Sequence, residues 1–308
     1  MMMQMIKKII VALGGNAFLK TGQKGTIKQQ INTVRETCKQ ISRMIQEGYQ
    51  VTLTTGNGPQ VGALALQNEI AKKQVPPMPL DVLVAESQGL IGYLIQQQLM
   101  IELKRIGLNI PVTTLLTQVL VNKNDPAFKN PTKPIGPYYP KKTSKNMIKE
   151  VEGWRRVVPS PKPKSIIEIE EIKTLVKKGV IVIACGGGGI PVVKKKGKLV
   201  GVEAVIDKDY ASQKLAIQLK AECLIFLTDV KYVYLNYEKK DQKPLRRITL
   251  KQAKRYLKEG HFKEGSMKPK IEASLNFLKS GGKKVIITNV SSLKKALKNK
   301  SGTIITSH

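Results

Sequence analysis

Short apolar runs alternate with amphipathic stretches along most of the chain. Residues 7–15 (KKIIVALGG) form an apolar run that ends in two glycines, and residues 49–62 form a second run that also leads into glycines. Between them, residues 26–47 place Ile31 and Cys38 on one face of a helix. This alternation predicts an α/β fold, with an open, mainly parallel sheet covered by helices.

The same periodicity continues toward the carboxyl end of the chain. It predicts further strands over 110–121, 180–185, 223–230 and 284–288, and further helices over 84–106, 168–178, 209–221, 249–258 and 267–280. Residues 122–164 interrupt this rhythm, because they are rich in proline and lysine and show little periodicity. Proline fixes φ and blocks ladder hydrogen bonds, so this segment predicts an irregular insertion or a small hairpin subdomain.

The charge of the chain is strongly positive. Its 308 residues include 53 lysines and arginines against 22 aspartates and glutamates, a formal net charge of +31. Such a charge is compatible with a basic nucleic-acid-associated binding protein, since phosphate neutralisation drives sequence-independent binding. However, the lysines are scattered over the whole chain and aromatic residues make up 5%. Because dedicated binders typically cluster arginines and stacking aromatics, we expect a lysine-rich surface and no nucleic-acid partner.

The cysteines and the apolar segments indicate the compartment. Cys38, Cys185 and Cys223 are odd in number and lack metal-ligand spacing, which predicts reduced thiols. The amino-terminal apolar stretch is too short and too charged for a signal peptide, and no stretch approaches the length of a membrane span. We therefore expect a soluble, cytoplasmic protein with no membrane partner.

Three glycine-bearing loops follow three of the predicted strands. They contain Gly14-Gly15-Asn16, Gly56-Asn57-Gly58 and the run Gly186 to Gly189. The carboxyl ends of parallel strands meet at one edge of a sheet, and successive glycines let backbone N–H groups approach an anion. The loops therefore predict one shared anion site, with three unrelated turns as the alternative.

Three further elements carry charged or polar side chains that suit phosphate. Asp207-Lys208-Asp209 precedes a predicted helix, where Asp209 suits an N-cap and the triplet also suits phosphate and magnesium. Lys270 lies in the first turn of another helix, where a cation opposes the helix dipole unless a phosphate binds there. Asp229, followed by several tyrosines, suits a nucleotide-base pocket or ordinary packing. The chain has two histidines and no HExxH motif, so we expect neither a Ser-His-Asp triad nor a zinc site of that type.

Several longer stretches together resemble carbamate kinases, which are members of the amino acid kinase family. They follow the order of that family and span nearly the whole chain: ALGGNA (12–17), TGNGPQVG (55–62), KNPTKPIGP (129–137), GWRRVVPSP (153–161), CGGGGIPVV (185–193), GVEAVIDKD (201–209) and HFKEGSMKPK (261–270). The inserted stretches KNPTKPIGP and GWRRVVPSP distinguish carbamate kinases from other members.

The resemblance implies a fold, an assembly and a reaction. The expected fold is a single αβα-sandwich domain over residues 1–308, assembled as a homodimer. An acceptor half, approximately 1–190, contains the inserted subdomain 122–164 as a lid, and a nucleotide half covers approximately 191–308. The implied reaction is reversible phosphoryl transfer between ATP and carbamate, giving ADP and carbamoyl phosphate, in catabolic ATP generation from arginine or citrulline. Mg²⁺ is expected with the nucleotide phosphates, and no protein metal ligand is expected.

The resemblance also implies roles for individual residues. Lys208 and Lys270 would bind the nucleotide phosphates and the transferred phosphoryl group, and Asp209 would orient both lysines. Lys133 would supply the cation that many relatives carry before the first glycine pair, where this chain has Ala12. The implied acceptor contacts are Gly14, Gly15, Asn16, Gly56, Asn57, Gly58, Gly186, Gly187 and Gly188, and the implied further nucleotide contacts are Asp229, Val230 and Tyr237.

Another amino acid kinase, acting on a carboxylate such as glutamate, is the alternative within the enzyme class. The inserted subdomain and Ala12 speak against it. The residues leave open whether the physiological direction makes ATP or carbamoyl phosphate.

Overall fold

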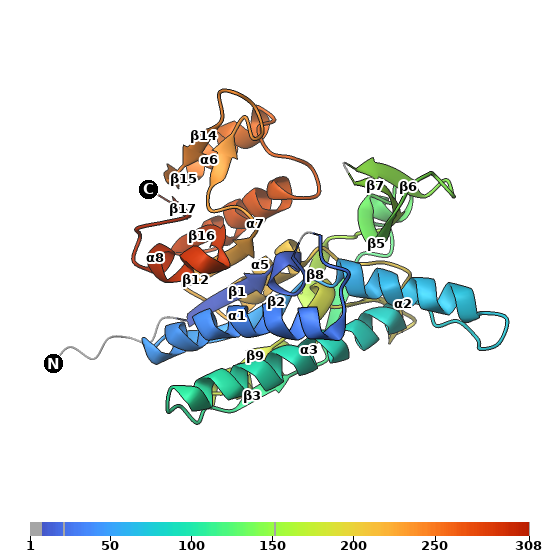
Figure 1. Ribbon diagram of the computed structural model, residues 1–308, viewed down its shortest axis with the longest axis horizontal. Coiled ribbons are helices and arrows are strands. Elements are labelled where there is room, and N and C mark those ends of the chain that lie inside the picture. Colours follow the sequence, from blue (N-terminus) through green and yellow to red (C-terminus); the bar gives the residue numbers. More distant parts are fainter. Residues whose placement is uncertain (1–7, 21, 151, 308) are drawn as a thin grey trace.

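A sheet of eight strands forms the centre of the computed structural model, which describes residues 8–20, 22–150 and 152–307 (Figure 1). Its strands are, in spatial order, β15 (Arg247–Thr249), β17 (Thr303–Thr306), β16 (Lys284–Asn289), β12 (Cys223–Thr228), β1 (Lys8–Leu13), β2 (Gln50–Thr55), β9 (Ile181–Ile183) and β3 (Val112–Thr114). The strands from β16 to β3 pair in parallel, whereas β17 runs antiparallel to β16. The predicted open, mainly parallel sheet is confirmed.

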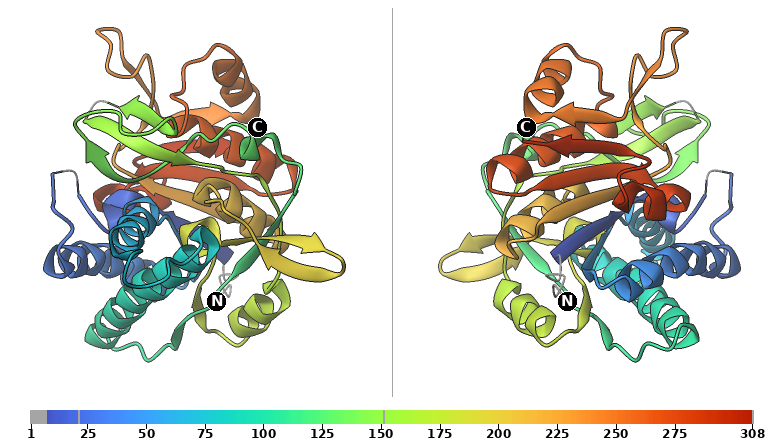
Figure 2. Two further views of the ribbon diagram at one scale, coloured as in Figure 1. Left: turned by 90° about the vertical axis from the view of Figure 1, so that its right-hand side faces the viewer. Right: turned by 90° about the vertical axis from the view of Figure 1, so that its left-hand side faces the viewer.

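Helices cover both faces of this sheet, which gives the expected αβα sandwich (Figure 2). One face carries α1 (Ile27–Gln46), α3 (Leu80–Arg105) and α8 (Leu293–Leu297), and the other carries α4 (Ile169–Lys177), α5 (Lys208–Gln218), α6 (Leu250–Lys258) and α7 (Met267–Lys279). No helix in the described ranges is long and apolar enough to span a bilayer.

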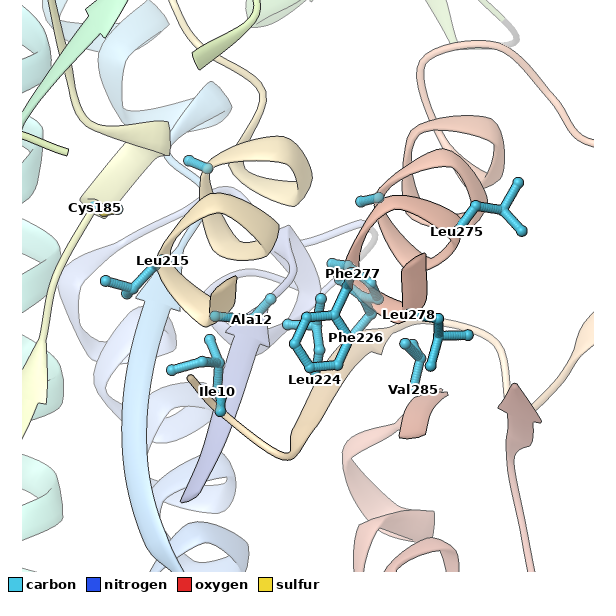
Figure 3. Close-up of a cluster of buried hydrophobic side chains, with 14 of the residues drawn as sticks. Ile10, Ala12, Cys185, Leu215, Leu224, Phe226, Leu275, Phe277, Leu278 and Val285 are labelled. Atoms are coloured by element: carbon cyan, nitrogen blue, oxygen red, sulfur yellow. The ribbon is translucent and has the colours of Figure 1, made fainter. Parts of the chain in front are cut away.

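Alternation along β1 explains how one strand supports two helical layers. Ile9 and Val11 pack into the core on the α1 and α3 side, whereas Ile10 and Ala12 pack toward α5 and α7. Figure 3 shows the second core, where Phe277 of α7 lies with the side chains of β1 and β12. Burying one large apolar side chain contributes about 1.5–3 kcal/mol, so this second core fixes α5 and α7 side by side on one face of the sheet.

Two predicted elements differ from the structure. The stretch 110–121 is two strands, because the chain turns after β3 and β4 (Gln118–Val121) joins a second sheet with β11 (Lys198–Gly201), β10 (Ile190–Lys195) and β8 (Pro163–Ile166). The side chain of Gln88 satisfies both backbone groups of Thr117 at this turn, at 2.9 and 3.1 Å, which lets the chain leave the first sheet. Residues 58–62 are not loop: they begin α2 (Gly58–Ala71), with proline in the first turn.

The inserted segment folds as a small antiparallel sheet, the inserted sheet, rather than as irregular chain. It consists of β5 (Lys133–Tyr139), β7 (Gly153–Val158) and β6 (Met147–Glu150), in that spatial order. Figure 1 shows it above α2, against which its strand β5 packs. A Cβ on Gly62 of α2 would lie 1.9 Å from the backbone nitrogen of Gly136, so two glycines allow this close approach.

The remaining elements are short. They are β13 (Val233–Leu235) and β14 (Lys243–Leu245), which form a hairpin, and the 3₁₀ turns η1 (Gly15–Ala17), η2 (Pro126–Phe128), η3 (Gly186–Gly188) and η4 (Val290–Ser292). The η1 and η3 turns directly follow the ends of β1 and β9, where two of the predicted glycine loops lie.

Candidate active site

The carboxyl ends of β1, β2 and β12 open onto a cavity of about 350 Å³. The starts of α2, α5 and α7 and the inserted sheet complete its walls. Most of the residues singled out from the sequence line this one cavity: Gly14, Gly15, Gly56, Asn57, Gly58, Lys133, Gly187, Lys208, Asp209, Asp229 and Lys270. The fold therefore brings together segments from seven separate parts of the chain.

Asp209 lies between two buried lysines at the centre of the cavity. Its carboxylate accepts a hydrogen bond from Lys208 Nζ and forms an ion pair with Lys270 Nζ at 3.1 Å. Burial alone would raise the pKa of Asp209, but the two ammonium groups outweigh it and hold that pKa well below its usual range. The α5 and α7 helices bring these groups together because their first turns lie side by side.

The two lysines differ although they share one carboxylate. Burial lowers the pKa of Lys208, and the attraction of Asp209 does not offset it. Burial also acts to lower the pKa of Lys270, but Asp209 and Asp207 outweigh it and raise that pKa. The shared carboxylate therefore raises the pKa of one lysine above its ordinary value but leaves that of the other below it.

A second ion pair joins the inserted sheet to the start of α5. Lys133 Nζ lies 2.5 Å from Asp207 Oδ2, and the other oxygen of Asp207 accepts a hydrogen bond from the backbone N–H of Asp209 at 2.9 Å. Asp207, rather than Asp209, is therefore the N-cap of α5. The prediction of Asp209 as the cap is therefore wrong by two residues. Asp207 had no separate predicted role, although an aspartate directly before a helix is itself a cap signal.

Two of the glycine N–H groups expected to face the acceptor are used within the protein. Gly14 N–H donates to the carbonyl of Leu227 at 3.0 Å, and Gly56 N–H donates to that of Leu13 at 3.2 Å. That part of the expectation is wrong, because these amides complete the strand ends. Both residues still line the cavity, where a Cβ on Gly14 would lie 2.6 Å from the Leu227 carbonyl oxygen.

Protein atoms surround the glycine run after β9. A Cβ would lie 2.9 Å from Gln88 Cγ at Gly186, 2.2 Å from Asn57 Nδ2 at Gly187 and 2.2 Å from the Ile206 carbonyl oxygen at Gly188. Gly187 lines the cavity, whereas Gly186 and Gly188 are buried outside its lining. Packing therefore requires these glycines, and Gly187 leaves room for the Asn57 amide, which donates to Ser87 Oγ at 2.8 Å.

The nucleotide-side residues lie partly outside the cavity. Asp229 lines it and accepts a hydrogen bond from Thr228 Oγ1 at 2.8 Å. Val230 is not part of the lining, and Tyr237 is 45% exposed, with its ring 5.8 Å from that of Tyr234. Asn16 belongs to η1, and its side chain lies outside what the structure describes.

With this geometry in view, comparison with known proteins decides the family. Residues 7–289 match the family model described as the amino acid kinase family. The chain belongs to the amino acid kinase family. It is accordingly an enzyme that transfers phosphoryl groups.

The full-length relatives of this amino acid kinase are carbamate kinases. The enzyme of Thermococcus kodakarensis is 49% identical over 97% of this chain and 98% of its own length, and that of Pyrococcus horikoshii is 47% identical over 98% and 100%. The solved carbamate kinase of Giardia lamblia bound to AMP-PNP superimposes with a TM-score of 0.91 at 42% identity, covering 98% of this chain and 99% of the other. The resemblance inferred from the motifs is confirmed.

Three residues of the inserted sheet line the cavity of this family member although no site role was inferred for them: Tyr138, Glu150 and Arg155. Arg155 Nε donates to the carbonyl of Gly136 at 3.1 Å, its guanidinium pairs with Glu150 at 3.4 Å, and its Cζ lies 5.1 Å from the centre of the Tyr138 ring. Arg155 belongs to the GWRRVVPSP stretch, so the sequence marked the segment that carries it. Whether its side chain faces the cavity depends on how the inserted sheet packs against the rest of the chain, which local sequence does not show.

The chemistry of the cavity is that of an anion site without a protein nucleophile. Its lining carries four cationic and four acidic side chains, and within it Lys133, Lys208 and Lys270 gather around Asp207 and Asp209. Among the described residues, no group of three or more histidines, cysteines, aspartates or glutamates could hold a metal ion. Cys185, two residues before Gly187, is buried, and burial raises the pKa of its thiol, so it is not a reactive thiolate.

Proposed function

We propose that the chain catalyses reversible phosphoryl transfer between ATP and carbamate, with ADP and carbamoyl phosphate as the products of one direction. The observation that carries the proposal is the meeting of Lys133, Lys208 and Lys270 in one cavity at the ends of the parallel strands. Full-length similarity to carbamate kinases supports the choice of carbamate as the acceptor.

In the proposed mechanism the protein positions the reactants and neutralises charge. Phosphoryl transfer spreads negative charge over the oxygens of the moving group, and preorganised cations stabilise that charge. Lys208 and Lys270 bind the nucleotide phosphates and the phosphoryl group in flight. Asp209, which contacts both, fixes their ammonium groups before the substrates arrive. Holding both reactants in line lowers the barrier further, because the reaction becomes effectively unimolecular.

Lys133 provides the third cation from the inserted sheet. Its side chain reaches the start of α5, where it pairs with Asp207 at 2.5 Å. The chain has the buried Ala12 just before the first glycine pair, at the place where many members of the family are expected to carry a lysine. Lys133 therefore contacts the transferred phosphoryl group from the side of the inserted sheet, and the inserted segment 122–164 acts as a lid that excludes water.

The acceptor binds among the glycine loops, on the side formed by residues 1–190. Gly15, Asn57 and Gly58 lie at this end, where the first amides of α2 have no partners within the helix and the helix dipole favours an anion. The nucleotide binds on the side formed by residues 191–308, near Asp229, with Val230 and Tyr237 as further predicted contacts.

Mg²⁺ enters this proposal as part of the substrate, bound to the nucleotide phosphates. The donor set fits that role better than a resident metal site, because Asp207 and Asp209 are both engaged by lysines. Mg²⁺ would neutralise phosphate charge that a lining with equal numbers of cations and carboxylates leaves uncovered.

The proposed direction in the cell is ATP formation. Carbamoyl phosphate is an acyl phosphate of high transfer potential, and the carbamate released decomposes to ammonia and CO₂, which draws the reaction toward ATP. Such a reaction fits the catabolism of arginine or citrulline in the cytoplasm. The buried thiols of Cys38 and Cys185 are free, which suits a reducing compartment.

We also place a homodimer contact on α3. Leu90, Tyr93, Met100 and Ile101 are 37–59% exposed and lie on one face of this helix. A row of large exposed apolar side chains on one helix marks a protein–protein contact, and a second copy of the chain is its proposed occupant.

The decisive test is ATP formation from ADP, Mg²⁺ and carbamoyl phosphate by the wild type and by Lys270→Ala. We expect the variant to lose at least about a hundredfold in kcat, the usual scale for one lost charge-stabilising donor. Lys268→Ala is the matched control, because Lys268 lies on the same helix and pairs with Glu264 at its exposed end. It should stay within twofold of the wild type.

The remaining outcomes contradict different parts of the proposal. If the wild type makes no ATP from carbamoyl phosphate, the acceptor is wrong, and carboxylates such as glutamate become the compounds to test. If Lys270→Ala retains full activity, the family stands but the assignment of the phosphate-binding lysines fails.

A further inference from the structure

Asp207 is the one buried carboxylate of the cavity that contacts the inserted sheet. It is 7% exposed, and its two oxygens have different partners. Oδ2 pairs with Lys133 of β5 at 2.5 Å, and Oδ1 accepts the N–H that begins α5 at 2.9 Å. One side chain thus joins the start of a core helix to a segment 74 residues away.

The other ion pair between the inserted sheet and the rest of the chain is of a different kind. Arg156 pairs with Glu69 of α2 at 2.5 Å, but both side chains are substantially exposed, at 39% and 48%. Exposed pairs contribute little because solvent screens them. The Lys133–Asp207 pair is 22% and 10% exposed, so it is the less screened of these two ion pairs, and it adds a polar contact on the cavity side to the apolar packing of Ile135 and Val158.

The charges around Lys133 explain why it needs this partner. Its ammonium group shares the cavity with those of Lys208 and Lys270, for which Asp209 is already the counterion. Without Asp207, Asp209 would be the one described carboxylate within ion-pair distance of any of these three ammonium groups, and repulsion would drive the most exposed of them outward. That cation is Lys133.

We propose that Asp207 is a positioning residue that holds the Lys133 ammonium, and with it the inserted sheet, over the start of α5. When the substrate binds, the transferred phosphoryl group replaces Asp207 as the ion-pair partner of Lys133. This inference rests on the role of Lys133 in the proposed function. The phosphoryl group brings more negative charge than the carboxylate does, so the exchange of partners follows its arrival. Asp207 itself touches no reacting atom.

Two variants separate the ion pair from the helix cap. Asp207→Asn removes the charge but keeps a good N-cap, whereas Asp207→Ala removes both. We expect Asp207→Asn to lower kcat for ATP formation about tenfold, with KM for ADP within twofold and an unchanged melting temperature. Asp207→Ala should lower kcat equally and lose about 2 °C in addition, as one lost cap predicts.

A double-mutant cycle tests whether Asp207 acts through Lys133. In a Lys133→Met background, Asp207→Asn should change kcat by less than twofold, because the group that it positions is gone. Glu69→Gln, which removes the exposed pair with Arg156, is the control and should leave kcat within twofold of the wild type.

Trp154 gives a readout that needs no substrate. It is the chain's single tryptophan, and it lies on β7, which pairs with β5 in the inserted sheet. In the ligand-free protein, Asp207→Asn and Lys133→Met should each increase the fast component of its fluorescence anisotropy decay by the same amount. The double variant should add nothing, and Glu69→Gln should resemble the wild type.

Three results would overturn the inference. An equal loss of kcat on Asp207→Asn with and without Lys133 would mean that the carboxylate acts on another group. A fall in kcat with an unchanged anisotropy decay would mean that Asp207 does not hold the inserted sheet. A melting temperature that falls as far in Asp207→Asn as in Asp207→Ala would make the residue structural. Because the anisotropy measurement requires no turnover, it stands even if the proposed reaction is wrong.

Discussion

Asp209 determines the charge state of two buried lysines. Lys208 and Lys270 are each within ion-pair distance of it, and all three side chains are at most 10% exposed. Removing one partner of such a group is costly, because the remaining buried charges lose their counterion. We therefore expect Asp209→Asn to lower the free energy of unfolding by about 3–5 kcal/mol at pH 7.

The pH dependence of Asp209→Asn follows from the same contacts. Burial already lowers the pKa of Lys208 below its ordinary 10.5, and without Asp209 the pKa of Lys270 falls as well. Between the folded and unfolded pKa values the unfolded chain binds more protons, so the stability of the variant should rise from pH 7 toward pH 10. In the wild type Lys270 adds no such slope, because its raised pKa makes its contribution constant below pH 10.5 and lost only above that.

Urea denaturation of both proteins at pH 7, 8 and 9 measures this difference. The expected slope approaches about 1.4 kcal/mol per pH unit for each lysine that releases its proton on folding. A variant whose stability has the same pH dependence as the wild type would mean that Asp209 is not the counterion of these lysines.

At the scale of elements, the η3 turn packs against Asn57 on the side of the cavity that we propose for the acceptor. Gly187 adopts φ +64°, and a Cβ there would lie 2.2 Å from the amide nitrogen of Asn57. Gly187→Ala should therefore displace Asn57 from Ser87 and destabilise the protein by about 2–4 kcal/mol, from overpacking and from backbone strain together. Gly89→Ala on α3 is the matched control, because nothing lies within 4 Å of its added Cβ.

Thermal unfolding and the KM for carbamoyl phosphate report the two effects of Gly187→Ala separately. The melting temperature should fall and KM should rise, whereas Gly89→Ala should be neutral or slightly stabilising, as expected within a helix. A Gly187→Ala protein with wild-type stability would mean that the Asn57 side chain has room to move.

At the scale of the whole molecule, the exposed face of α3 predicts self-association. Tyr93→Glu combined with Met100→Glu should raise the dimer dissociation constant about a hundredfold or more, because each charge would be buried without a partner in the contact. Sedimentation velocity over a range of protein concentrations measures this. Val200→Glu, on the exposed strand β11, is the control and should leave the sedimentation unchanged. A wild type that sediments as a monomer at every concentration would contradict the proposed contact.

The sequence by itself determined the elements and most members of the cavity. Apolar periodicity acts over a few residues, so it identified α1, the buried strands and the glycine loops that follow them. Parallel strands present their carboxyl ends at one edge, which is why loops far apart in the chain were expected at one site. The motifs then indicated the family.

The tertiary structure decided which groups act on one another. The pairing of Lys133 with Asp207, the use of the Gly14 and Gly56 amides by neighbouring strands, and the placement of Arg155 in the cavity all depend on contacts between distant segments. The split of residues 110–121 into two sheets likewise depends on Gln88, a side chain from another helix. Local periodicity carries no information about such partners, because they are fixed only when the inserted sheet and the helices pack against the central strands.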